Sequence, residues 1–265
     1  MRQHGLPVPV IDTGRPHSAR IYDYLLGGKD NYRVDQQAGD ELLAAAAHER
    51  AAARAGRAFL ERAVRHVVGA GLRQVLDIGT GLPHSPNVHE VALAAAPDVR
   101  VAYVDNDPIV VAHADALLRG SGVVGVALAD LRDPQAVVEH PQVREVIDFD
   151  RPVALLLTSV LHFLTDAQRP GEVVATLRDA LSDGSCLVLS HATDDFADCR
   201  AAQAVYAHAT TPLTPRSHAE IEEFLGGFEL LAPGLVPVPS WRPDAPSTAP
   251  PATIGVYGAV ARKAG

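Results

Sequence analysis

The chain has 265 residues, 47% of them hydrophobic and 21% charged, which suffices for one large α/β domain with a substantial core. Its formal net charge of -9 and pI near 5.7 argue against a nucleic-acid partner, because binding to a phosphate backbone requires a basic excess. The sequence has no apolar run of membrane-helix length and no leader pattern, which disfavours a membrane partner. Only 2 cysteines are present, which disfavours a disulfide framework. These features predict a cytoplasmic protein that binds a small molecule.

The first 70 residues are expected to form an irregular arm and a helical lid. Residues 1–17 are interrupted by Pro and Gly without periodicity, which predicts the arm. Residues 18–32 combine three tyrosines, several charges and a Gly-Gly turn, a mixture that suits a lid; the alternative is a helix whose tyrosines simply pack on the sheet. This segment is not a phosphate loop, because Asp23 and Asp30 replace the residues that such a loop requires. Residues 38–68 show helical spacing and predict one amphipathic helix or a broken pair.

Strands and helices alternate from residue 71 onward, and this region, residues 71–265, is expected to be the core of a single structural domain. The expected strands are 75–78, 101–105, 123–128, 153–159 and 186–190, with helices near 87–96, 108–119 and 170–181. Alternating βα units imply a parallel, doubly wound sheet.

The C-terminal part is expected to add a helix and two strands. Residues 217–220 match a capping box, and Gly226 ends the helix before a strand that begins near Glu229. A final strand is expected at 253–260. The Pro- and Ser-rich residues 237–251 predict a long exposed loop between these strands.

The most informative motif is the glycine turn of Gly79, Thr80 and Gly81, with Asp105 one βαβ unit downstream. The glycines let the backbone turn sharply and approach a ligand closely. Asp105 ends the second strand, where a carboxylate can accept hydrogen bonds from both hydroxyls of a ribose. The pairing predicts a site for a nucleoside cofactor.

The turn favours S-adenosylmethionine (SAM) over a dinucleotide. His84 occupies the position where a dinucleotide fingerprint has Gly or Ala, and nearby prolines delay the helix to about Asn87, too late to present its amides to a diphosphate. Asp77 precedes the first glycine, where a carboxylate would repel a pyrophosphate but attract an amino group and a sulfonium. The alternative for Asp77 is a strand-end residue that caps the following turn.

Two further strand ends carry candidate cofactor residues. Asn106 accompanies Asp105, and Asp107 is expected to cap the helix that follows. Asp130 could accept a hydrogen bond from the adenine amine while Leu131 covers the ring. A solvated loop before the next helix is an equally good interpretation of the latter pair.

Thr158 and His162 follow the fourth strand, where a substrate would meet the transferable group. His162 is the candidate general base, since a neutral imidazole takes up a proton near neutral pH. A histidine between Leu161 and Phe163 also suits a core residue satisfied by the backbone, and His191 has a similar standing. The 12 histidines form no tight group with cysteines or carboxylates, so no metal site is predicted.

Five segments of the chain carry a resemblance to a known family. They are YDYLLGGKDN (22–31), LDIGTGL (76–82), YVDNDP (103–108), DLRDP (130–134) and DFDRPVAL (148–155). Together they resemble an actinobacterial family of SAM-dependent methyltransferases long catalogued as a domain of unknown function.

This resemblance implies the Rossmann-like α/β fold of class I methyltransferases. Such a fold has a seven-stranded, mostly parallel sheet with its last strand antiparallel, helices on both faces, and an N-terminal helical extension that closes over the cofactor. The resemblance also places cofactor binding on Asp77, Gly79, Gly81, Asp105 and Asp130. The turn at 27–31 would lie against the methionine end, which adds Tyr22, Lys29 and Asn31 as candidate contacts.

The sequence therefore predicts an enzyme that transfers a methyl group from SAM to oxygen, nitrogen or carbon of a small molecule by in-line displacement. A motif of the Asn-Pro-Pro-Tyr type is absent after the fourth strand, which argues against methylation of nucleic-acid bases or amides. Two alternatives remain open at this point: an NAD(P)-dependent oxidoreductase of Rossmann type, and a SAM-binding regulatory module without turnover. The expected assembly includes the option of a homodimer.

Overall fold

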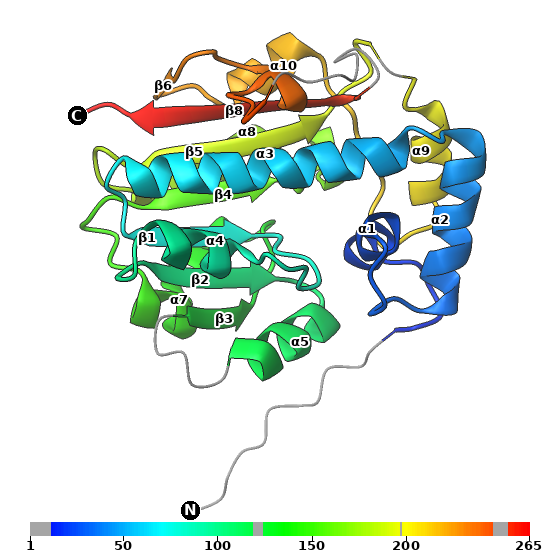
Figure 1. Cartoon of the computed structure of the whole chain (residues 1–265), viewed down its shortest axis with the longest axis horizontal. Coiled ribbons are helices and arrows are strands. Elements are labelled where there is room, and N and C mark those ends of the chain that lie inside the picture. The colour runs from blue at the N-terminus through cyan, green and yellow to red at the C-terminus, as the bar shows by residue number, and fades with distance from the viewer. Residues whose placement is uncertain (1–11, 119–123, 197, 246–253) are drawn as a thin grey trace, which may run out of the picture.

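The computed structural model describes residues 12–118, 124–196, 198–245 and 254–265, which fold around one sheet (Figure 1). The strands are β1 (Gln74–Ile78), β2 (Arg100–Asp105), β3 (Val124–Leu128), β4 (Ala154–Thr158), β5 (Cys186–Ala192), β6 (Phe228–Leu230), β7 (Val236–Pro237) and β8 (Val256–Lys263). The α-helices are α1 (Ser18–Leu26), α2 (Arg33–Ala45), α3 (Glu49–Gly69), α4 (Val88–Ala95), α5 (Pro108–Leu118), α6 (Pro134–Glu139), α7 (Pro141–Val146), α8 (Pro170–Ala180), α9 (Arg200–Tyr206) and α10 (His218–Glu223). Short 3-10 helices are η1 (Leu161–Phe163), η2 (Asp166–Gln168) and η3 (Val238–Ser240). No helix in these ranges is both long and apolar enough to cross a membrane.

The sheet confirms the predicted mostly parallel topology, and the described residues form one strand more than the seven that the resemblance implied. Its eight strands follow the order β3-β2-β1-β4-β5-β8-β6, with β7 paired to β8 off this path. Strands β1 to β5 are parallel, whereas β8 runs antiparallel to β5. The strand order reverses at β1, between β2 and β4, and in sheets of this kind such a reversal opens a crevice at the carboxyl ends of the strands.

Both faces of the sheet are covered by helices. Successive strand residues point to opposite faces, so Val75 belongs to one apolar cluster and Leu76 to the other. Helix α3 packs against β4, β5 and β8 and buries Phe59, Val64 and Val67 there. Since burial on both faces removes apolar side chains from water throughout the sheet, the strands form a rigid base for the residues at their ends.

A third apolar cluster lies beyond one end of the sheet. It joins Ile21 and Leu25 of α1 to Leu42 of α2 and Tyr206 of α9, and Figure 1 shows these three helices gathered together. We call α1, α2 and α9 the cap. The sequence placed the lid within residues 1–70, but α3 packs with the core and α9 comes from a much later part of the chain.

Most predicted elements agree with the structure to within a few residues. The capping box at 217–220 starts α10, with the Ser217 N–H donating to Oε2 of Glu220 at 2.8 Å. The predicted helix at 38–68 is a broken pair, α2 and α3, and the final strand begins at residue 256 instead of 253. Residues 1–11 of the expected arm, and expected element ends at 119, 123 and 253, lie outside the described residues.

The Pro-rich segment 237–251 differs from its prediction in its first part. The segment begins at Pro237, the last residue of β7, and continues into η3. Both Val238 and Trp241 are fully buried. The Trp241 ring packs edge-on against Phe59 of α3, with ring centroids 5.5 Å apart. Prolines predicted an exposed loop, but two large apolar side chains anchor this stretch to the core. Residues 246–251 lie outside the described residues.

The anchoring role of Trp241 can be measured. We expect Trp241→Ala to lower the free energy of unfolding by about 3–5 kcal/mol, the usual cost of removing a fully buried aromatic side chain. The matched control is Leu128→Ala, which truncates a side chain in a residue that is 42% exposed and should cost less than about 1 kcal/mol. Urea titration followed by circular dichroism measures both values. Equal losses would show that residues 238–241 are not part of the core.

Candidate functional site

A cavity of about 190 Å³ lies where the carboxyl ends of the parallel strands meet α1, α3 and α9. One water needs only about 10–15 Å³ on this measure, so the cavity accommodates a much larger molecule. Eleven of the predicted site residues line it: Tyr22, Asp77, Gly79, Thr80, Gly81, Asp105, Asn106, Asp130, Leu131, Thr158 and His162.

The glycine turn after β1 depends on its glycines. Gly79 and Gly81 have φ of 75° and 69°, in the left-handed region that side chains disfavour. A Cβ on Gly79 would lie 2.4 Å from Cγ2 of Val160, whereas one on Gly81 would meet open space. The Gly79 N–H donates to the carbonyl of Val104 at 2.8 Å, which holds the turn against β2. The turn is thus closely packed at its first glycine and open at its second.

Asp105 organises the end of β2. Its Oδ2 accepts the N–H of Gly81 and its Oδ1 the N–H of Asp107, both at 2.9 Å. Burial raises the pKa of Asp105 to about 6, and these hydrogen bonds oppose the rise. Because each carboxylate oxygen has two lone pairs, both oxygens can still accept a hydrogen bond from a ligand.

Asp77 is a second buried carboxylate in the same cavity. Burial raises its pKa to about 7, while the guanidinium of Arg57 and a hydrogen bond from Thr80 act in the opposite direction. The single proton of the Thr80 hydroxyl can instead be donated to the backbone carbonyl of Asp77, 3.1 Å away, which would cap the turn through the main chain. Two carboxyl groups with raised pKa values in one cavity are typical of a binding or catalytic site.

Arg57 was not predicted from the sequence. It lies on α3, lines the cavity, and donates through Nη2 to the carbonyls of His84, at 2.7 Å, and Pro86. Its Nε is buried without a hydrogen-bond partner among the described residues; the nearest carboxylate, that of Glu61, is 3.8 Å away. A helical arginine looks like a solvated charge in the sequence, and only the packing of α3 shows that it faces the cavity.

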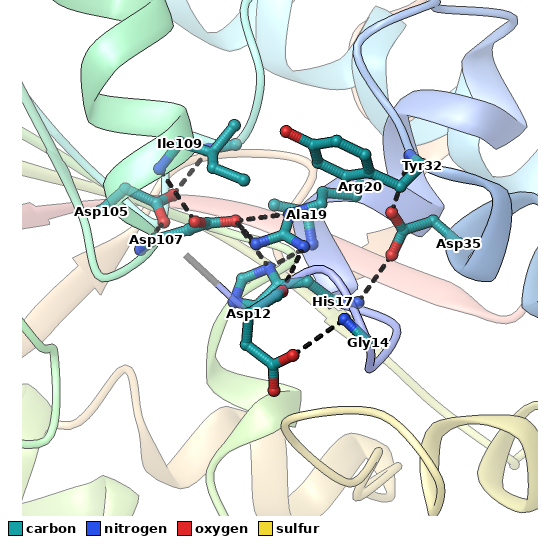
Figure 2. Close-up of polar contacts among 11 residues, drawn as sticks. Asp12, Gly14, His17, Ala19, Arg20, Tyr32, Asp35, Asp105, Asp107 and Ile109 are labelled. Atoms are coloured by element: carbon teal, nitrogen blue, oxygen red, sulfur yellow. Dashed lines mark hydrogen bonds and ion pairs between the residues drawn. The ribbon is translucent and has the colours of Figure 1, made fainter. Parts of the chain in front are cut away.

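A buried ion pair ties the cap to the end of β2 (Figure 2). Nε and Nη2 of Arg20 each lie 2.9 Å from Oδ2 of Asp107, and both side chains are almost fully buried. The other oxygen of Asp107 accepts the N–H of Ile109 at 2.9 Å and so caps α5, as the sequence predicted. His17 adds a contact of 3.5 Å to Asp107. Asp107 therefore fixes both the start of α5 and the position of α1.

Asp130 is strongly paired. Although burial raises its pKa, hydrogen bonds from Arg132 outweigh this effect and lower it, with Nε of Arg132 at 2.9 Å from Oδ1. Asn106 also donates to Asp130, and the buried Leu131 lies beside it on the cavity wall. The carboxylate is thus ionised and oriented, which agrees with either a ligand contact or a structured loop.

The surroundings of His162 argue against a general base. Its Nδ1 accepts the N–H of Ala192 at 3.1 Å, so the neutral ring carries its proton on Nε2 and can only donate there. Burial lowers the pKa of His162 well below its ordinary value, as do His191 and Arg216. His191 lies outside the cavity lining with both ring nitrogens engaged, by the carbonyl of Ala192 at 2.7 Å and by Arg216 at 3.1 Å. It is a structural histidine.

Lys29 and Asn31 are not brought to the cavity. The Asn31 amide donates to Asp23 at 2.7 Å and to the carbonyl of Gly28 at 3.1 Å, which closes the turn after α1. A Cβ on Gly28 would overlap the Asp23 carboxylate at 1.9 Å. The polar residues of this motif therefore bind one another, and the sequence could not distinguish this from ligand binding.

The described ranges contain no group of three or more His, Cys, Asp or Glu residues that could hold a metal ion.

Comparisons with known proteins agree on one family. A family model described as S-adenosyl methyltransferase matches residues 6–264. The chain is similar to the crystal structure of a DUF574 family protein from Streptomyces avermitilis, with 43% identity and a TM-score of 0.91 over 96% of this chain and 100% of that one. It is also similar to a putative methyltransferase from Thermobifida fusca, with 38% identity and a TM-score of 0.90 over 98% and 99%.

More distant likeness concerns the fold alone. N-methyltransferase NodS from Bradyrhizobium japonicum, in complex with S-adenosyl-L-homocysteine, has 15% identity and a TM-score of 0.50 over 92% of this chain and 98% of that one. A search of curated proteins finds no match.

The packing of the glycine turn leads to a prediction. Gly79→Ala should lower the free energy of unfolding by about 1–2 kcal/mol for the left-handed φ and about 1–3 kcal/mol more for the clash with Val160. Gly81→Ala, the matched control, has the same backbone strain without the clash and should lose only the first amount. Adding Val160→Ala should make Gly79→Ala less costly than it is in the unaltered chain. Urea denaturation measures the two glycine variants, Val160→Ala alone and the double variant, and identical losses for the two glycine variants would contradict the assignment.

Proposed function

The chain belongs to the S-adenosyl methyltransferase family, and we propose that it methylates a small-molecule acceptor bound in the cavity beside SAM. It is a SAM-dependent methyltransferase, which replaces the oxidoreductase and regulatory-module alternatives. The observation that carries the proposal is the single cavity that holds Asp77, the glycine turn and Asp105 and is walled by the cap. A concave cavity of this kind suits a small acceptor better than a macromolecule.

The residues of the cavity fit the cofactor's chemistry. The carboxylate of Asp105 would accept hydrogen bonds from the ribose hydroxyls, and that of Asp77 would pair with the ammonium group of the methionine end. Arg57 carries a donor with no hydrogen-bond partner among the described residues, suited to the cofactor's carboxylate. We propose that Asp130 and Leu131 hold the adenine, as the sequence predicted, and that Asn106, which donates to Asp130, orients that carboxylate. Two buried carboxylates beside the turn would repel the diphosphate of a dinucleotide.

Bound SAM supplies a methyl group activated by its sulfonium. The chain's part is to hold the acceptor in line with that group at about 3–3.5 Å, since orientation of this kind supplies several kcal/mol of the barrier reduction. The cap forms part of the cavity wall, and we propose that Tyr22 and Thr158 help to shape the cavity. The Tyr22 hydroxyl already donates to the carbonyl of Ala53 at 3.1 Å, so it can accept one more hydrogen bond. His162 would donate through Nε2 and orient the acceptor.

Calorimetric titration tests the proposal. SAM and S-adenosylhomocysteine should bind, and NADH should not. Methyl transfer from labelled SAM to a panel of small amines, phenols and acids should then identify an acceptor class. Tight binding of NADH without SAM binding would overturn the cofactor assignment.

The role of Asp105 leads to a second prediction. Asp105→Asn removes the charge at nearly constant size and should weaken SAM binding roughly 10- to 100-fold, because hydrogen bonds to a charged group contribute about 1.5–3 kcal/mol. Asp150→Asn, an equal charge change at an exposed residue away from the cavity lining, should leave the affinity unchanged. Equal affinities of the two variants would refute the ribose assignment.

The raised pKa values predict a pH dependence of binding. In the free protein the carboxyl groups of Asp105 and Asp77 are neutral below about pH 6 and 7, respectively, and charged above. Only the charged forms attract the cofactor's cationic end, and they accept hydrogen bonds from its hydroxyls more strongly than the neutral forms do. The dissociation constant for SAM should therefore rise as the pH falls through 7 and 6, by up to about tenfold per pH unit for each neutral carboxyl group. A constant value between pH 8 and pH 5 would contradict the role of both groups.

A further inference from the structure

The cavity continues past the cofactor residues into an aromatic compartment. Val160, which contacts the glycine turn, is followed by His162 and Phe163 on η1. The Phe163 ring lies 4.5 Å from that of His162 and 5.3 Å from that of Tyr206 on α9, centroid to centroid. Leu213 completes this apolar wall. The compartment therefore adjoins the β4 loop that packs against the glycine turn, and an acceptor would sit in it.

One carboxylate faces this compartment. Glu49 starts α3 and lines the cavity, with its side chain 22% exposed. The pKa values of Tyr206 and Cys199 are raised mainly by burial and, to a smaller extent, by the negative charge of Glu49. This charge effect places Glu49 near both residues. The one ion-pair partner of Glu49 among the described residues is His48, at 3.7 Å. An acidic residue in the first turn usually stabilises a helix from a solvated position. Glu49 is instead largely removed from water, and this burial raises the pKa of its carboxyl group.

The two arginines that line the cavity are engaged with carboxylates assigned to the cofactor. Arg57 acts on Asp77, and Arg132 is paired with Asp130. The described lining of the cavity includes no other arginine and no lysine. An anionic acceptor would therefore meet Glu49 without a compensating cation, whereas a basic nitrogen would meet a carboxylate and two aromatic rings.

We propose that the acceptor is an amine on an apolar body, with Glu49 binding its nitrogen while Phe163 and Tyr206 enclose its apolar part. This inference rests on the proposed function and adds the acceptor class to it.

The charge changes of the reaction support an amine. The lone pair of a neutral amine forms the new N–C bond while the C–S bond breaks and sulfur keeps that electron pair. The positive charge thus moves from sulfur to nitrogen. A carboxylate and aromatic faces beside the nitrogen stabilise the cation that develops there. Phenols and acids react as anions, and Glu49 would repel an anion.

Calorimetry on the protein saturated with S-adenosylhomocysteine tests the inference without turnover. The probes are 2-phenylethylamine, its alcohol isostere 2-phenylethanol, and 3-phenylpropanoate. The amine should bind at least about tenfold more tightly than the alcohol, as expected for a hydrogen bond to a charged group, and the acid should bind most weakly. Glu49→Gln should abolish the preference for the amine and leave the affinity for S-adenosylhomocysteine unchanged.

Two further variants separate charge from packing. Glu41→Gln removes the same charge at an exposed position of α2 outside the cavity lining and should keep the preference. Phe163→Leu should weaken binding of the amine a few-fold while Glu49 still favours it over the alcohol.

The outcomes are distinguishable. If S-adenosylhomocysteine binds normally, three results would overturn the inference and leave the proposed function intact. These are no binding of the amine, no preference for the amine over the alcohol, and a preference that survives Glu49→Gln. Failure of S-adenosylhomocysteine to bind would overturn both.

Discussion

A continuous series of hydrogen bonds through two neighbouring carboxylates holds the functional end of this molecule together. Asp105 accepts from the glycine turn and from the backbone of Asp107, and Asp107 in turn caps α5 and pairs with Arg20 of α1. These two side chains hold together three separate segments: the glycine turn, the connection from β2 to α5, and α1. Since a buried carboxylate without partners is strongly destabilising, the segments must keep these positions for the fold to remain stable.

The same arrangement links folding to ligand binding. Asp77 and Asp105 are buried with raised pKa values, which shows that the protein alone does not fully compensate their charges. A ligand with cationic groups and hydroxyls would supply the missing compensation. The ion pair between Arg20 and Asp107 places α1 beside Asp105. The cap therefore adjoins a carboxylate whose electrostatic environment would change when the ligand binds.

The sequence predicted the features that depend on local patterns. The parallel strands, the glycine turn and Asp105 follow from apolar runs, glycine positions and spacing, and the structure has them where expected; the order of the strands in the sheet was not predicted. Arg57 and Glu49 could not be found in this way, because polar residues on a long helix look solvated until the packing of α3 is known. Trp241 was misjudged for the converse reason: prolines suggested exposure, but long-range contact with Phe59 buries the segment.

The composition of the cap has a consequence for divergence among relatives. The walls of the aromatic compartment include Tyr206 and Leu213 from the connection between β5 and α10, whereas the paired carboxylates belong to β1 and β2. Substitutions in that connection can reshape one half of the cavity without touching the other. In the proposed assignment the cofactor and the acceptor therefore contact different segments, so that new acceptors can arise in evolution, or by grafting one short segment, on an unchanged SAM-binding scaffold.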